Sequence, residues 1–83
     1  MPSMARYYFD YRVGAVLAPD EDGLEMSNVE EAHDQAVGVL VEATRDAILE
    51  GATEQVFAVE VRDEIGPVLE VNAVFGSKIF RRQ

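Results

Sequence analysis

The hydrophobic pattern of this chain changes its period twice, from two residues to about 3.6 and back to two. Apolar side chains alternate with polar ones over residues 6–13, and they do so again over residues 55–62 and 67–75. A period of two with aromatic and β-branched residues predicts strands buried on one face. Between these regions, residues 28–50 carry apolar side chains at helical spacing. The pattern therefore predicts one long helix packed against strands.

Turn residues divide the strand regions further. A Gly-Ala turn at residues 14–15 precedes a short strand at 16–18, and a turn with proline and glycine at 19–23 follows it. A brief extended piece at 24–26 leads to the helix, and residues 63–66 form a hairpin turn. The order is ββαββ. It predicts the α+β class: a two-layer sandwich with a small antiparallel sheet and one long helix across one face.

The helix carries start and stop signals as well as a stripe. Ser27 and Glu30 have the spacing of a capping box, and Gly51 is suited to end the helix. We expect the buried stripe to contain Val29, Ala32, Ala36, Leu40, Ala43 and Ala47. We expect the sheet to add Tyr7, Phe9, Tyr11, Phe57, Val59, Val61, Leu69, Val71 and Phe75 to the core.

A second apolar band lies to one side of this stripe. Val37, Val41 and Ile48 form it, and two interpretations stay open: the sheet edge or the C-terminal residues cover the band, or it is a subunit interface. Residues 1–83 make a single domain, with flexible ends expected at 1–5 and 77–83, and so short a chain has a thin core. Burying the three side chains would contribute about 4–6 kcal/mol of gross hydrophobic free energy. The sequence therefore favours a homodimer.

The sheet face away from the helix carries side chains of mixed charge, with Tyr8 among them. Such a face is typical of a solvated surface with weak ion pairs. The alternative is a second interface in which Tyr8 is the anchor.

The charge is acidic and uneven. The chain carries a net charge of −9, and residues 20–64 hold fourteen acidic and two basic side chains. Phosphate groups are repelled by such a surface, so the folded body is not expected to bind nucleic acid. Either the charge keeps the protein in solution, or the acidic surface meets a basic protein partner.

Residue types for metal or catalytic chemistry are scarce. The chain has no cysteine and one histidine, His33, so a Cys/His zinc site cannot form within it. The acidic turn at residues 20–23 does not fit a calcium loop, because Ala18 and Val29 occupy the first and twelfth positions. The sequence predicts no catalytic, metal-binding or cofactor-binding residues. It has no leader pattern, and its longest apolar run, residues 36–41, is far shorter than a membrane span, so a cytoplasmic protein without membrane contact is expected.

Four short motifs together resemble a family of short bacterial domains, frequent in rhizobia, that is catalogued only as a domain of unknown function. The motifs are the RYYFD start at residues 6–10, the D-x-x-G-x-E pattern at 20–25, the helical alanines Ala32 and Ala36, and VEVRDE-x-G at 59–66. The resemblance covers most of the chain and implies no site residues.

A looser resemblance is to HicB-type antitoxins, which also pass from an aromatic strand through an acidic turn into a Glu- and Ala-rich helix. Residues 7–9, 20–23 and 30–36 follow that order, but the chain lacks the extra hairpin strand and the DNA-binding extension of these antitoxins. We therefore expect a non-enzymatic interaction module. The alternatives are an antitoxin-like inhibitor of a basic partner, and a small-molecule-binding domain with a pocket between the helix and the strand of Tyr7, Phe9 and Tyr11.

Overall fold

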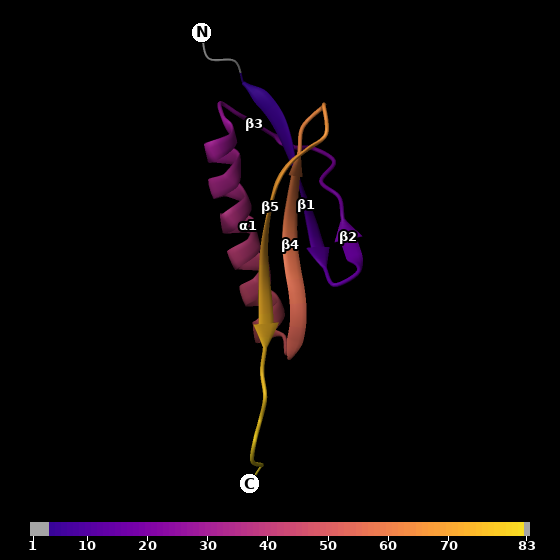
Figure 1. Cartoon of the computed structure of the whole chain (residues 1–83), viewed down its shortest axis with the longest axis vertical. Coiled ribbons are helices and arrows are strands. Elements are labelled where there is room, and N and C mark those ends of the chain that lie inside the picture. Colours follow the sequence, from indigo (N-terminus) through magenta and orange to yellow (C-terminus); the bar gives the residue numbers. More distant parts are fainter. Residues whose placement is uncertain (1–3, 83) are drawn as a thin grey trace.

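The computed structural model describes residues 4–82 and shows one helix against an antiparallel sheet, which confirms the α+β class (Figure 1). Of the ends expected to be flexible, residues 1–3 and 83 lie outside the described residues. The extended piece at 24–26 forms a strand of its own. The elements are β1 (Ala5–Val13), β2 (Val16–Ala18), β3 (Leu24–Met26), α1 (Val29–Leu49), β4 (Glu54–Arg62) and β5 (Pro67–Gly76).

The sheet has the order β2-β1-β4-β5, and β3 also pairs with β1. All pairs are antiparallel; Phe9 lies opposite Val61, and Val61 lies opposite Leu69. Both short strands occupy the outer edge of β1: β2 pairs with residues 11–13 and β3 with residues 5–7. The edge of β1 is thus covered at both ends, whereas β5 has a neighbour on one side only.

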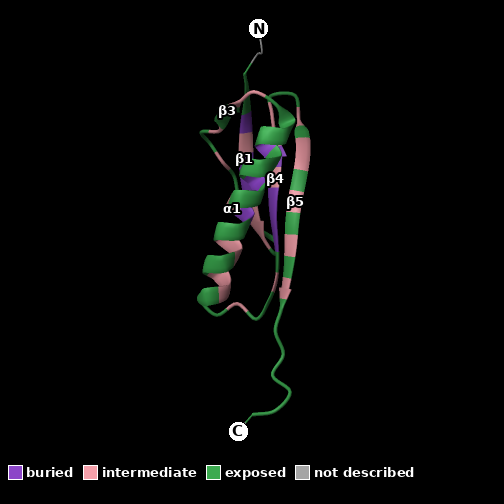
Figure 2. Ribbon diagram, turned by 90° about the vertical axis from the view of Figure 1, so that its left-hand side faces the viewer, coloured by how far each residue is buried: buried purple, intermediate pink, exposed green. Residues whose placement is uncertain are grey.

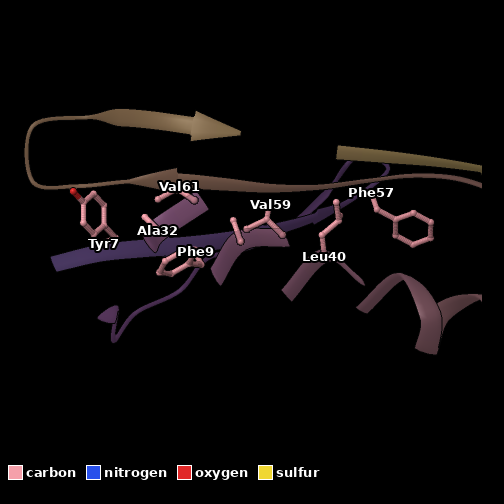
Figure 3. Packing of buried hydrophobic residues seen from close by; sticks show 8 residues of the cluster. Tyr7, Phe9, Ala32, Leu40, Phe57, Val59 and Val61 are labelled. Carbon is pink, nitrogen blue, oxygen red and sulfur yellow. The ribbon is translucent and has the colours of Figure 1, made fainter. Parts of the chain in front are cut away.

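The core lies between α1 and the central pair β1–β4. Its cluster contains Tyr7, Phe9, Ala32, Ala36, Leu40, Phe57, Val59 and Val61 (Figure 3). The remaining sheet residues expected in the core, Tyr11, Leu69, Val71 and Phe75, are only partly buried. Three of these four belong to β5, because an edge strand has no neighbouring strand to complete its burial.

The helical stripe is buried at its centre and not at its start. Ala32 and Ala36 have no exposed surface, and these small side chains let the helix axis lie close to the sheet. Ala43 and Ala47 are half-buried. The prediction that Val29 is buried is wrong: its side chain is 45% exposed, because it is the first helical residue and no earlier turn covers it.

The helix cap is displaced by one residue from the predicted one. Asn28 is the N-cap, and its side-chain oxygen accepts a hydrogen bond from the Glu31 amide at 2.8 Å. The Glu31 carboxylate in turn accepts from the Ser27 amide at 3.0 Å, which lowers the pKa of Glu31. The prediction of Ser27 and Glu30 as the capping pair is therefore wrong. Asn and Ser are about equally good caps, so the pattern alone could not choose between neighbours.

Candidate interaction surface

A groove of about 380 Å³ runs between the C-terminal half of α1 and β5. Figure 2 shows α1 crossing the sheet at an angle, with its C-terminal end displaced away from β5. The walls of the groove are apolar except for one threonine and one arginine. They comprise Leu40, Val41, Thr44, Arg45, Ile48, Leu49 and Ala73, and together with the outer edge of β5 they are called the groove face below.

Two of the three residues predicted for a subunit interface line this groove. Val41 is 58% exposed and Ile48 is half-buried. Val37, one turn before Val41, is 38% exposed. The second apolar band is therefore covered only in part by the sheet. Its use as an interface remains a prediction.

Leu49 also lines the groove, and the sequence reasoning missed it. Its side chain is 77% exposed at the last position of α1. Successive helical residues differ by about 100° in direction, so a helical wheel assigns Leu49 to the solvent side. The local signal was the Ile-Leu pair at residues 48–49, which is separated from the helix stop at Gly51 by Glu50 alone.

The outer edge of β1 is closed between β2 and β3 by the Asp20 loop (residues 19–23). Oδ2 of Asp20 accepts a hydrogen bond from the Phe9 amide at 3.1 Å. Oδ1 accepts from the amides of Asp22 and Gly23 at 3.1 and 3.2 Å, which fixes the turn. Gly23 has a φ of +70°, and a Cβ there would lie 2.9 Å from the carbonyl oxygen of Tyr7. The loop therefore takes the place of a strand partner at the middle of β1.

The same hydrogen bonds set the ionisation of Asp20. Partial burial acts to raise the pKa of this carboxyl. The backbone N–H groups of Phe9, Gly23 and Asp22, together with the charge of Arg62, oppose that effect and hold the pKa below its usual value. The carboxylate form of Asp20 is thus the form that the folded chain stabilises.

Arg62 ties the Asp20 loop to the open face of the sheet. Its Nε donates to Oδ2 of Asp10 at 2.9 Å, and its Nη2 donates to the Asp20 carbonyl at 3.1 Å. Oδ1 of Asp10 accepts from the Asp20 amide at 2.9 Å. Asp10 is only 7% exposed, so the expectation of a solvated face is wrong at this residue. It is covered because the loop folds over it.

Tyr8, the residue predicted to anchor a second interface, lies in the same network. The Arg62 guanidinium carbon is 4.4 Å from the centre of the Tyr8 ring, a cation–π distance. Tyr8 is half-buried, so this contact uses part of its surface. Elsewhere on this face, Arg12 and Glu60 pair at 2.7 Å with both side chains partly exposed. The second interface at Tyr8 remains a prediction.

The described residues offer little for metal or catalytic chemistry. Within residues 4–82, no group of three or more His, Asp or Glu side chains is arranged to hold a metal ion. His33 is exposed, and its Nδ1 lies 3.5 Å from the carboxylate of the adjacent Asp34, away from the groove walls. Across the same residues, no helix combines the length and the apolar composition that a membrane crossing requires.

The family described as "Domain of unknown function (DUF6894)" matches residues 6–74, far more than half of the chain. The chain belongs to the DUF6894 family. No curated protein and no solved structure matches it.

The DUF6894 match contains the whole Asp20 network and nearly all of the groove face. Asp10, Asp20 and Arg62 lie within it, as do the groove residues of α1 and Ala73 of β5. The C-terminal segment (residues 77–82) lies beyond the matched range. The family description assigns no activity to this DUF6894 chain.

Proposed function

We propose that this domain is a non-catalytic interaction module of the cytoplasm that works as a homodimer joined through its groove face. The observation that carries the proposal is the apolar groove beside an edge strand that has no outer neighbour. Apolar grooves of this kind are commonly buried by a partner in proteins that function as assemblies. A second copy supplies the same apolar surface and the same strand edge.

The energetic reason for dimerisation is the thin core. A single small core provides only about 3–5 kcal/mol of stability. Fully burying a valine or leucine contributes about 1.5–3 kcal/mol, and Val41 and Leu49 keep more than half of their surface exposed. Ile48 is already half-covered, so its share is smaller than the sequence alone suggested. Burial across a dimer would still stabilise the fold by an amount comparable to its own core.

The test is the molar mass of two matched variants. Val41→Glu places a carboxylate in the groove, whereas Val16→Glu places one on a valine of β2 that is 73% exposed at the opposite side of the sheet. We expect a dimer for the wild type and for Val16→Glu, and a monomer for Val41→Glu, by light scattering or sedimentation equilibrium. A monomeric wild type, or a dimeric Val41→Glu, contradicts the proposal.

A second candidate function is the antitoxin-like inhibition of a basic protein. The exposed surface of α1 favours it, because this surface is strongly acidic. Arg45 is the one basic residue of the helix, and the exposed acidic residues are Glu30, Glu31, Asp34, Glu42 and Asp46. Charge attraction of this kind weakens with salt. Recovery of one basic protein at fixed stoichiometry, lost at high salt and lost in a Glu42→Lys/Asp46→Lys variant, would support this candidate.

A third candidate, small-molecule binding, moves to a different place from the one expected. Tyr7 and Phe9 are buried in the core cluster, so the helix and β1 leave no room at the predicted pocket. The groove, at about 380 Å³, lies within the size range of ligand sites. A rise in melting temperature with an apolar metabolite, abolished by Val41→Glu, would favour this candidate.

A further inference from the structure

The backbone of β5 offers a continuous set of hydrogen-bonding groups at the sheet edge. The Val56 carbonyl accepts from the Gly14 amide at 2.9 Å, so the polar backbone groups of Val56 face away from β5. Those groups alternate sides along a strand. Val59 therefore faces β5, where it lies opposite Val71. Val71 and Ala73 direct their N–H and C=O groups toward β4. The residues that alternate with them, 70, 72 and 74, therefore direct these groups outward, away from the sheet.

The C-terminal segment continues from the end of β5 away from the body, along the long axis of the molecule (Figure 1). It carries two apolar residues that the body does not cover: Ile79 is 67% exposed and Phe80 is 93% exposed. Three bases flank them, Lys78, Arg81 and Arg82. In the described part of the chain, no hydrogen bond or ion pair joins residues 77–82 to the body. The segment is thus basic, apolar and extended.

The turn between β4 and β5 has the complementary character at the other end of the same strand. Ile65 is 97% exposed at its tip. Asp63 and Glu64 precede it and carry negative charge. The two ends of the β4–β5 hairpin therefore carry opposite charge, and each presents an uncovered isoleucine.

We infer that two copies of the chain pair edge to edge through β5, antiparallel, with the two-fold axis passing beside Asn72. This inference rests on the proposed homodimer and specifies how it is built. Asn72 lies near the middle of β5, and Ile79 and Ile65 lie seven residues after and before it. Along the extended strand, residues at equal distances from the axis face one another, so Pro67 lies beside residue 77 of the partner copy and Ile79 comes close to the partner's turn at Ile65.

Charge disfavours an axis two residues earlier in β5. With the axis at Asn72, the basic C-terminal segment of one copy runs toward the acidic turn at residues 63–66 of the other, twice by symmetry. An axis at Glu70 would place the two Glu70 carboxylates directly opposite each other, and like charges so placed are destabilising. The axis at Asn72 sets Glu70 opposite Val74 instead. Opposite charges thus meet at both ends of the joint strand, and like charges do not meet at its centre.

The same arrangement closes the groove. An axis perpendicular to the sheet keeps both helices on one face of the joined sheet. Val71 of each copy then lies opposite Ala73 of the other, and Ala73 is part of the groove floor. The two grooves face each other across the joint, so the exposed side chains of Val41 and Leu49 come to lie between two helices and not in water.

The absence of cysteine from the chain makes a direct test simple. Asn72→Cys creates one thiol per copy, and residues facing each other in a hydrogen-bonded antiparallel pair have Cα atoms about 5.5 Å apart, which suits a disulfide. We expect rapid and nearly complete conversion to a covalent dimer on mild oxidation of the dilute protein. Ala15→Cys, an exposed position at the opposite side of the sheet, serves as the control and should stay uncrosslinked.

A second cross-link tests the C-terminal segment. The double variant Ile65→Cys/Ile79→Cys should form a covalent dimer, while each single variant should not, because neither residue meets its own copy. A wild type that is dimeric by light scattering, with an Asn72→Cys variant that stays uncrosslinked, overturns this inference and leaves the proposed homodimer standing. A monomeric wild type overturns both. Cross-linking at residue 72 without the 65–79 link overturns the placement of the segment.

Discussion

Asp20 accepts hydrogen bonds from two groups of backbone amides, those of its own loop and the outward-facing amide of Phe9. One of its carboxylate oxygens serves the turn of its own loop, and the other accepts the amide of Phe9 in the gap between β2 and β3. A neutral amide side chain of the same size cannot do both, because its nitrogen is a donor. The residue is a link between chain segments, held in place by Asp10 and Arg62 on the open face.

The change Asp20→Asn should therefore destabilise the fold by about 1–3 kcal/mol, the usual cost of leaving a buried amide without an acceptor. Urea denaturation at neutral pH measures it. Asp22→Asn removes the same charge from the same loop at a side chain with no hydrogen bond in the described structure, and it should change stability by less than about 0.5 kcal/mol. Equal losses in the two variants would show that net charge, and not the bond to Phe9, is responsible.

The lowered pKa of Asp20 adds a pH dependence with a defined sign. The unfolded chain binds this proton at about pH 3.9 and the folded chain at a lower pH. The contribution of Asp20 is therefore complete above about pH 5, and it is lost progressively as the pH falls through the native pKa. Urea midpoints measured from neutral pH into this acid range should fall more steeply for the wild type than for Asp20→Asn.

At the level of elements, the repeating hydrophobic patterns predicted which face of the helix and of the long strands is buried. The alternation of Tyr7 and Phe9 placed β1, and the alanines Ala32 and Ala36 placed the buried side of α1, because burial acts on every second or every third to fourth residue. The residues that hydrogen-bond across loops were not predicted. A single carboxylate such as Asp20 has no period, and its partner Phe9 is eleven residues away.

One local signal for the loop was present in the sequence. The pattern Asp-x-x-Gly occurs at residues 20–23 and again at 63–66. In both turns the aspartate Oδ1 accepts from the amides two and three residues later. Because Oδ1 alone serves the turn in this motif, the motif predicts that Oδ2 of Asp20 is free to accept a hydrogen bond from another part of the chain. The position of β5 at the edge of the sheet had no comparable signal, since a hydrophobic period does not specify strand order.

The start of α1 offers a prediction at this scale. Asn28→Ala removes the acceptor for the Glu31 amide and should cost about 1 kcal/mol. Ser27→Ala should cost much less, because Ser27 contributes its backbone amide to the cap. The free energy of unfolding of both variants checks this. A larger loss in Ser27→Ala would restore the capping box that the sequence pattern suggested.

On the scale of the whole molecule, a domain that gains stability from its own second copy cannot have a fixed midpoint of denaturation. If the groove face is buried in a dimer, mass action shifts the folding equilibrium with protein concentration. The urea midpoint of the wild type should rise when the protein is concentrated tenfold or more, and that of Val41→Glu should stay constant. A constant wild-type midpoint over this range would argue for a stable monomer.

The two edges of the sheet differ in what they permit. A bare strand edge is a template that can recruit one chain after another, and unprotected edges are how folded proteins enter fibres. Here the far side of β1 is covered by β2, β3 and the Asp20 loop, so at this side the described chain exposes only the outer edges of two three-residue strands. The proposed dimer would therefore offer no long bare strand edge to a third copy. In the proposed dimer the Asp20 loop helps to limit assembly to two copies, and opening it would expose the middle of β1 as a new edge for further chains.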